Sequence, residues 1–403
     1  MSQFDPAAKL SKRTSQVEEA IIVQMAQKAR DLRTKGLDVV GLTIGEPDFD
    51  TPEYIRKAAE KAMADGHTHY APMNGIPELR QALAEKFNAE NRLDYAPNEI
   101  SLSNGAKQSI TNTIFAVVDP GDEVILLAPI WVAYEGIIQM VGGIPRIVHA
   151  GVEDNFKVPA SRLADALTER TKLIILNSPN NPTGAVYTRD ELSEIAKVIS
   201  AHPSAFAISD EIYEYILFDG EHISLGTMPG MRERTITVNG FSKGFAMTGW
   251  RLGYTGAPEP VTRAITKVQG TFTAGANAFV QRAAIAAIKG DRSDVEEMRL
   301  SYLRRRELMV EGLAKIPGII APTPAGAFYM FADFSAYLGK RAGNRHIATV
   351  TELADWLLEK HLVATVPGTA FGDSQCIRFS FAASDADIKT GLDRLAVGLA
   401  ELE

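Results

Sequence analysis

A chain of 403 residues is long enough for two domains, and its 45% hydrophobic and 23% charged residues are typical of a soluble globular protein. The net charge of -8 argues against general nucleic-acid binding, and no apolar run reaches the roughly 18 residues that span a membrane. The single cysteine, Cys376, excludes a disulfide within the chain and a cysteine cluster for zinc, and we expect it to be buried or half-buried. Residues 1–12 lack the apolar segment of a secretion signal, so we expect a cytoplasmic protein.

The expected elements alternate between helices and short apolar strands. The spacing of apolar residues predicts helices over 17–35 and 76–88, with Pro77 in the first turn of the second. Most of the strands that follow are apolar on both faces, which indicates a parallel sheet covered by helices on each side. These strands are expected at 123–127, 144–148, 173–176, 205–209 and 235–238. After about residue 291 we expect helices at 295–313 and 350–360 and a strand at 377–381.

This order predicts an α/β fold with a large domain, built on a mostly parallel sheet between helices, and a smaller α+β domain. The expected parts are an N-terminal arm with part of the small domain (1–46), the large domain (47–292) and the small C-terminal domain (293–403). We expect the basic run from Arg304 to Arg306 to be a solvated helix face.

Polar side chains follow three of the expected strands. Asn181 lies in a loop with two prolines and two asparagines, Asp210 follows the strand at 205–209, and Lys243 follows the strand at 235–238. Ligands of parallel sheets bind beyond the carboxyl ends of the strands, so these residues predict a site there. The plain alternatives are a turn, a helix N-cap and a surface lysine, respectively.

Three further segments carry candidate binding groups. Residues 103–108 follow a strand-like run and open a helix, where backbone N–H groups can bind a phosphate, although the ending of a P-loop is absent. Arg378 interrupts an apolar strand, so it either binds a carboxylate or forms a structural ion pair. Trp131 either stacks on a ligand ring or belongs to the core.

Together, the segments at 177–184, 209–213 and 242–253 resemble those of the pyridoxal-phosphate (PLP) enzymes of fold type I, specifically the class I aminotransferases. The resemblance covers nearly the whole chain. It implies that Lys243 forms a Schiff base with PLP and later moves the Cα proton of the substrate. It also implies that Asp210 pairs with the pyridine nitrogen, while Tyr213 and Asn181 contact the phenolic oxygen.

The remaining contacts follow from the same resemblance. Trp131 would stack on the pyridine ring, and Arg378 with the backbone of Gly45 would bind the substrate α-carboxylate, with Trp131 and Asn181 nearby. Tyr70 resembles the tyrosine that crosses to the phosphate of a second copy, which implies a homodimer with shared active sites. No metal ion is expected. The implied phosphate contacts are Gly105, Ala106, Lys107, Ser242, Arg251 and Tyr70.

The resemblance is greatest to the bacterial aspartate aminotransferases of the I-beta subgroup. It implies that Lys107 binds the distal carboxylate of aspartate; a solvated helix lysine is the alternative. Glu18 stands where members that also accept prephenate carry a lysine, although Lys12 lies nearby. Gly275 and Ala276 depart from a usually Ser/Thr-rich stretch. We expect 2-oxoglutarate as the amino acceptor, with oxaloacetate and glyoxylate as alternatives.

Three rival functions share parts of this pattern. An aromatic or alanine aminotransferase of broader specificity has the same cofactor residues. A PLP-dependent lyase acting at Cβ or Cγ shares the fold and the lysine, but Arg378 with Lys107 favours a dicarboxylate. A PLP-dependent transcription regulator needs a DNA-binding domain, for which we expect no room before the enzyme-like pattern begins.

Overall fold

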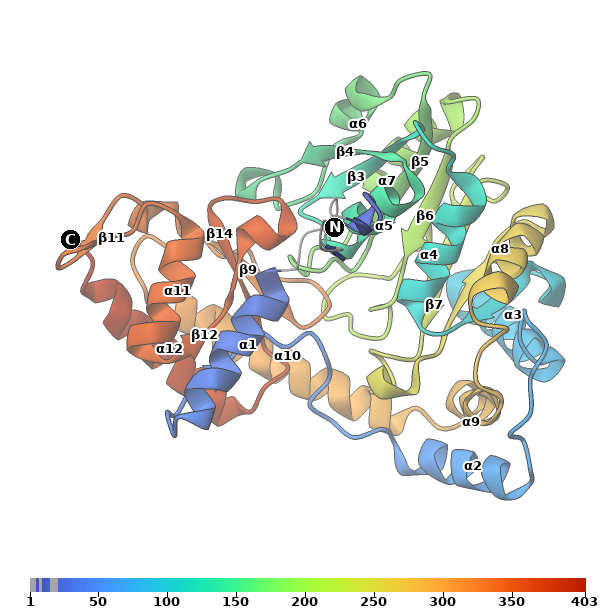
Figure 1. The fold of residues 1–403 in the computed structure, drawn as a ribbon, viewed down its shortest axis with the longest axis horizontal. Coiled ribbons are helices and arrows are strands. Elements are labelled where there is room, and N and C mark those ends of the chain that lie inside the picture. Colours follow the sequence, from blue (N-terminus) through green and yellow to red (C-terminus); the bar gives the residue numbers. More distant parts are fainter. Residues whose placement is uncertain (1–4, 7–8, 15–20) are drawn as a thin grey trace.

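A seven-stranded sheet forms the centre of the computed structural model, which describes residues 5–6, 9–14 and 21–403 (Figure 1). The strand order is β2-β8-β7-β6-β5-β3-β4. Neighbouring strands from β7 to β4 are parallel, whereas β8 is antiparallel to both β7 and β2. The strands are β2 (Ile100–Ser103), β3 (Glu123–Ala128), β4 (Ile144–His149), β5 (Thr171–Asn177), β6 (Phe206–Asp210), β7 (Thr235–Gly240) and β8 (Gly253–Gly256).

Helices cover both faces of this sheet, as the doubly apolar strands predict. On β5, Leu173 and Ile175 belong to one buried cluster, and Ile174 and Leu176 belong to another, because successive side chains of a strand point to opposite faces. The first cluster includes residues of α4 (Ala106–Val117), α5 (Ala133–Val141) and α8 (Glu259–Phe272). The second includes residues of α6 (Ala160–Ala166) and α7 (Arg189–Ala201).

The C-terminal part carries a second, three-stranded antiparallel sheet of order β13-β14-β9. The N-terminal segment joins this part, because β1 pairs in parallel with β12. The fold class predicted from the sequence is therefore confirmed, while the boundaries at 46 and 292 stay predictions. The elements here are α1 (Ile21–Thr34), β1 (Val40–Gly41), α10 (Ser293–Ala314), β9 (Tyr329–Asp333), β10 (Arg341–Ala342), β11 (Arg345–His346), α11 (Val350–His361), β12 (Val363–Ala364), β13 (Val366–Pro367), β14 (Cys376–Ser380) and α12 (Asp385–Ala400).

Three further helices, α2 (Glu53–Ala64), α3 (Pro77–Asn91) and α9 (Ala278–Lys289), lie at the other end of the molecule (Figure 1). Helix α3 begins at Pro77, one residue after the predicted start, and extends three residues beyond the predicted end. For the helix expected at 17–35, residues 17–20 lie outside the described part. Short 3-10 turns occur at Pro97–Glu99, Val152–Asp154, Leu225–Thr227, Thr248–Trp250, Ser335–Tyr337 and Gly368–Phe371.

The prediction that Arg304 to Arg306 form a solvated face is wrong for two of the three residues. Arg305 and Arg306 are 7% and 6% exposed. Arg305 donates two hydrogen bonds to Asp48, at 2.8 and 2.9 Å, and Arg306 pairs with Asp219. Arg306 also donates to the adjacent Glu307, but Asp48 and Asp219 lie far away in the sequence, so the local pattern of α10 gives no sign of this burial.

Cys376 is buried with a free thiol, as expected, and burial raises its pKa. Among the described residues, no helix is both long enough and apolar enough to cross a membrane.

Candidate active site

The carboxyl ends of β5, β6 and β7 meet a cavity of about 340 Å³ that also contacts β9 and β14. Parallel strands bring their carboxyl ends to one edge, which is why residues distant in the sequence meet here. Most of the residues singled out in the sequence line this cavity: Gly45, Ala106, Lys107, Trp131, Asn181, Asp210, Tyr213, Ser242, Lys243, Arg251 and Arg378.

Lys243 follows β7 and presents its amine to the cavity, where Nζ donates a hydrogen bond to the backbone carbonyl of Gly45. No described carboxylate forms an ion pair with it. Burial lowers the pKa of Lys243 to about 8, and the positive charges of Arg378 and Arg251 act in the same direction. A large share of these amines is therefore neutral near pH 8, the form that acts as a nucleophile or base.

Asp210 ends β6 and is 4% exposed. Its Oδ2 accepts a 2.6 Å hydrogen bond from the Tyr134 hydroxyl, and its Oδ1 accepts one from the Ile212 backbone at 3.3 Å. Burial raises the pKa of Asp210 to about 6, although the Tyr134 hydrogen bond opposes this rise. The helix N-cap alternative does not hold, because no α-helix begins here.

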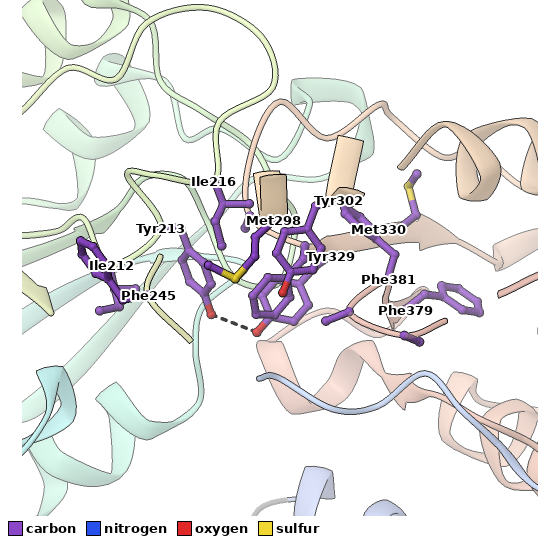
Figure 2. Packing of buried hydrophobic residues seen from close by; sticks show 14 of the residues in the cluster. Ile212, Tyr213, Ile216, Phe245, Met298, Tyr302, Tyr329, Met330, Phe379 and Phe381 are labelled. Carbon is purple, nitrogen blue, oxygen red and sulfur yellow. Dashed lines mark hydrogen bonds between the residues drawn. The ribbon is translucent and has the colours of Figure 1, made fainter. Parts of the chain in front are cut away.

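Two tyrosine hydroxyls meet across the join between the large sheet and β9. The hydroxyls of Tyr213 and Tyr329 lie 2.9 Å apart, and Figure 2 shows them pointing at each other. Burial raises the pKa of Tyr213 well above its ordinary value, so its hydroxyl stays protonated and can donate. The loop that carries Asn181 is fixed by Asn177, whose Oδ1 accepts from the Asn181 backbone at 2.8 Å.

Arg378 is 2% exposed, yet it has no carboxylate partner in the described part of the chain. Its Nη1 donates to Asn181 Oδ1 at 3.0 Å and its Nη2 donates to the Thr43 carbonyl at 2.7 Å. The buried Nε has no hydrogen-bond partner. The rings of Tyr329 and Phe371 flank the guanidinium at 4.6 and 4.8 Å. A buried cation without an anion is costly, so this geometry favours a bound carboxylate over a structural ion pair.

The start of α4 forms a cradle with Arg251. Gly105 has a φ of +92°, and a Cβ atom at this position would lie 2.5 Å from Arg251 Nη2. Gly253 is packed just as closely, since a Cβ atom added at this position would lie 2.3 Å from the Ala106 backbone nitrogen. Ser242 is buried beside them in the cavity wall. Backbone N–H groups, a hydroxyl and a guanidinium together suit an anion such as a phosphate.

Lys107 and Trp131 lie together at the mouth of the cavity. Lys107 Nζ is 4.8 Å from the centre of the Trp131 ring. Desolvation, followed by repulsion from Arg251, lowers the pKa of Lys107. Trp131 is half-buried and lines the cavity, so it is not simply a core residue.

Two of the residues predicted from the sequence, Gly105 and Tyr70, do not line the main cavity. Gly105 lies behind Ala106 in the cradle and does not itself line the cavity. Tyr70 is 94% exposed and lines a second cavity, together with Asn104, Arg251 and the segment from Thr273 to Phe279. Gly275 and Ala276 belong to this second cavity. Arg251 lines both cavities, so they are neighbours.

The sequence analysis missed three groups of this site. The Tyr134 hydroxyl donates a hydrogen bond to the Asp210 carboxylate, and the Asn177 side chain donates one to the Asp210 backbone carbonyl at 2.9 Å. The Tyr329 hydroxyl forms a hydrogen bond with that of Tyr213. Tyr134 follows Trp131 by three residues, a spacing that places two side chains on one helical face. Asn177 follows an apolar strand like the other candidates. No signal in the sequence singles out Tyr329.

These groups define a class of protein: a doubly wound α/β enzyme with a cationic pocket at the carboxyl edge of its sheet. The chain belongs to the class I and II aminotransferases, since the model of that family matches residues 37–395. The matched region includes the residues that line the cavity from Gly45 to Arg378.

Its relatives agree with this assignment. The chain is 42% identical over 408 residues to a bifunctional aspartate aminotransferase and glutamate/aspartate-prephenate aminotransferase of Petunia hybrida, covering 100% of this chain and 85% of the relative. It is 42% identical to a probable aspartate/prephenate aminotransferase of Aquifex aeolicus, covering 98% of this chain and 99% of the relative.

Solved structures show the same similarity in three dimensions. An aspartate aminotransferase from Rhizobium meliloti matches with a TM-score of 0.96 and 38% identity over 100% of both chains. An aspartate aminotransferase from Thermus thermophilus, solved with maleate, matches with a TM-score of 0.91 and 42% identity over 96% of this chain and 99% of the other.

Proposed function

We propose that this protein is a PLP-dependent aminotransferase that moves the amino group of L-aspartate to a 2-oxo acid, with 2-oxoglutarate as the expected acceptor. One observation carries the proposal: the buried guanidinium of Arg378, which has no carboxylate partner among the described residues, faces the same cavity as the half-buried amine of Lys243. The pair suits a substrate with a carboxylate beside the carbon at which an amine reacts.

The residues of the cavity fit PLP. Lys243 would hold it through its aldehyde, Asp210 would face its ring nitrogen, and Tyr213 with Asn181 would contact its phenolic oxygen. The cradle of Gly105, Ala106, Lys107, Ser242 and Arg251 would hold its phosphate, and Trp131 would cover its ring. When bound, PLP supplies an electron sink for the electron pair that remains on the substrate Cα after its proton is removed.

The chain itself supplies orientation and proton transfer. Arg378, with the backbone at Gly45, fixes the α-carboxylate and thereby aims the Cα–H bond. The Lys243 amine, whose pKa is about 8, takes the Cα proton from the amino-acid donor in the first half of the reaction. In the second half it gives a proton to the Cα of the new amino acid. Lys107 carries a positive charge at the mouth, where the distal carboxylate of aspartate extends.

The relatives support aspartate as the donor, since those from Petunia hybrida and Aquifex aeolicus are named for it. Both names also include prephenate, which makes prephenate a second candidate acceptor. The sequence argues against prephenate, because Glu18 stands where relatives that accept prephenate carry a lysine. Glu18 lies outside the described residues, so a substrate panel decides. Oxaloacetate, glyoxylate and the aromatic or alanine donors belong in the same panel.

The proposal includes a cytoplasmic homodimer. Its support is the exposure of Tyr70 in a cavity adjoining the phosphate cradle, where a second copy can contribute.

Chemical trapping tests the central assignment. Borohydride reduction of the protein incubated with PLP is expected to leave a pyridoxyl group on Lys243, identified by peptide mass spectrometry. Lys243→Ala should abolish both the label and the formation of oxaloacetate from aspartate. Lys267→Ala, which changes an exposed lysine on α8, is the matched control and should behave as the wild type. A label on another lysine contradicts the proposal.

A further inference from the structure

Tyr134 is a polar group of the cavity wall to which the proposed function gives no part. It is 2% exposed, and its hydroxyl donates a 2.6 Å hydrogen bond to Asp210 Oδ2. Among the described residues, no other side chain donates to this carboxylate within hydrogen-bonding distance. The second oxygen accepts only the Ile212 backbone N–H at 3.3 Å. Each oxygen therefore keeps a lone pair for a ligand in the cavity.

The position of the hydroxyl is set by packing. Tyr134 lies in the first turn of α5, and its ring belongs to the core cluster between the helices and the sheet. Its ring meets that of Trp131 edge to face, with centres 5.4 Å apart. Asn177 separately fixes the backbone of Asp210 through its carbonyl. A ring held in this way cannot follow the carboxylate, so the carboxylate must adapt to the hydroxyl.

The hydrogen bond from Tyr134 also affects the charge state of Asp210. Burial is the largest influence on Asp210 and raises its pKa to about 6, and the neighbouring charge of Glu211 adds to the rise. The Tyr134 hydroxyl, the Ile212 N–H and the cation of Lys243 lower it. Burial and the charge of Asp210 raise the pKa of Tyr134 well above its ordinary value, so Tyr134 remains the donor.

The geometry points to Tyr134 as a positioning residue that holds Asp210 as an anion and turns its free lone pairs toward the ring nitrogen of the cofactor. This inference rests on the proposed function. It adds that two neighbouring residues of the cavity wall have different tasks: Trp131, just before helix α5, covers the ring, and Tyr134, in the first turn of α5, positions the carboxylate at its edge.

Binding of pyridoxamine 5′-phosphate as a function of pH tests the inference. This ligand has no aldehyde, so its affinity does not depend on bond formation with Lys243. Binding opposite a protonated ring nitrogen needs the Asp210 anion. In the wild type the affinity should therefore fall as the pH drops through about 6, the pKa of Asp210. The dissociation constant is measured by equilibrium dialysis between pH 5 and 9.

Tyr134→Phe removes only the hydroxyl, so the pKa of Asp210 should rise. The fall in affinity should then begin roughly one pH unit higher, the size expected for one charge-assisted hydrogen bond, with a loss of about fivefold at pH 6 that approaches tenfold at lower pH. Tyr95→Phe is the matched control, since Tyr95 is 3% exposed and its hydroxyl bonds Thr237 at 3.1 Å on the same sheet. Its curve should coincide with that of the wild type.

A fluorinated tyrosine placed at position 134 keeps the shape and strengthens the donor. It should move the fall in affinity to lower pH, opposite to Tyr134→Phe, and it serves if Tyr134→Phe fails to fold. Unshifted curves for these variants, or equal shifts in Tyr95→Phe, overturn the inference. A wild type that binds neither PLP nor pyridoxamine 5′-phosphate instead overturns the proposed function, and the inference with it.

Discussion

Two cations of the cavity differ in their surroundings, and this difference separates their expected tasks. Arg378 is enclosed, with two of its nitrogens bonded to Asn181 and the Thr43 carbonyl. Lys107 lies at the mouth, over the ring of Trp131. Every amino acid carries an α-carboxylate, but only dicarboxylates carry a second. The enclosed cation therefore suits the shared group, and the cation at the mouth suits the distal group.

Substitution of each cation separates the two tasks. Arg378→Ala should lower kcat/KM for aspartate and alanine alike, whereas Lys107→Ala should lower it for aspartate and spare alanine. A charge-assisted hydrogen bond contributes roughly 1.5–3 kcal/mol, so the selective loss should be about ten- to a hundredfold. The ratio of the two substrates within each variant is the measured quantity, which removes the effect of a partial folding defect. An equal loss for both substrates in Lys107→Ala means that Lys107 serves the cradle alone and does not bind the distal carboxylate.

The residues that line the cavity were predictable to the extent that they follow strands. Asn181, Asp210 and Lys243 each come after an apolar run, and a parallel sheet brings such positions together. Tyr134 and Tyr329 were not predictable, because each acts through another side chain of the site. Their partners, Asp210 and Tyr213, lie 76 and 116 residues away in the sequence.

At the scale of elements, the turn from Glu211 to Glu214 connects the cavity to a buried network of charges. Glu211 accepts hydrogen bonds from Ser209 and Ser224 and pairs with His222 at 2.9 Å. Glu214 pairs with Lys86 of α3 and accepts from Asn91 at 2.8 Å. Glu211, Glu214 and His222 lie close enough to hold a metal ion. The amine of Lys86 pairs with Glu214, and, although burial opposes the rise, the charge of Glu211 raises the pKa of His222, so both carboxylates have partners within the protein.

Removing the charge of Glu214 should lower the free energy of unfolding, because its partner Lys86 is buried. The side chains of Lys86 and Glu214 are only 1% and 4% exposed. Glu214→Gln removes the nearer anion of the buried Lys86 amine and leaves only Glu90, at 3.9 Å, and we expect a loss of about 3 kcal/mol in the free energy of unfolding, measured by urea denaturation. Adding Lys86→Met should recover part of this loss, because the stranded charge is then gone and the amide oxygen introduced at position 214 can still accept from Asn91.

The exposed pair of Glu53 and Lys57 on α2 is the matched control, with side chains 68% and 67% exposed. Glu53→Gln should leave the denaturation midpoint in place, because solvent screens such pairs. If Glu214→Gln behaves like Glu53→Gln, or if the double variant is less stable than the single one, the buried pair does not carry the stability assigned to it.

The elements show the same limit to prediction as the residues. The strands and the main helices follow from apolar periodicity, because the local sequence determines which face of an element is apolar. The burial of Arg305 and Arg306 does not follow from it, because that burial depends on Asp48 and Asp219 from distant segments. A basic run on a long helix is usually solvated, and only the fold reveals where an acidic partner lies.

At the scale of the whole molecule, the surface beside the proposed active site carries large exposed side chains. Tyr70 is 94% exposed, and Met73 and Phe272 are 49% and 55% exposed. Tyr70 shares its cavity with Arg251 of the phosphate cradle. Large apolar side chains gathered beside a functional site are typical of an interface. In the proposed homodimer, Tyr70 of each copy completes the site of the other.

Subunit mixing tests this arrangement directly. Lys243→Ala should be inactive because its own site lacks the amine. Tyr70→Ala should bind PLP at least tenfold more weakly, as expected for the loss of one hydrogen bond to a charged phosphate. In a mixed dimer, one site carries both defects. The other combines Lys243 from the Tyr70→Ala chain with Tyr70 from the Lys243→Ala chain, and it is intact.

Refolding the two variants together should therefore restore activity at low PLP concentration, to at most about a quarter of the wild-type value for equal amounts, since half of the dimers are mixed and each has one intact site. Refolding each variant alone sets the baseline. Combining Lys243→Ala with Asp210→Ala is the matched control, because both residues lie in the same chain's cavity and no mixed dimer has an intact site. Restored activity in the control, or none in the test mixture, rules out a site shared through Tyr70.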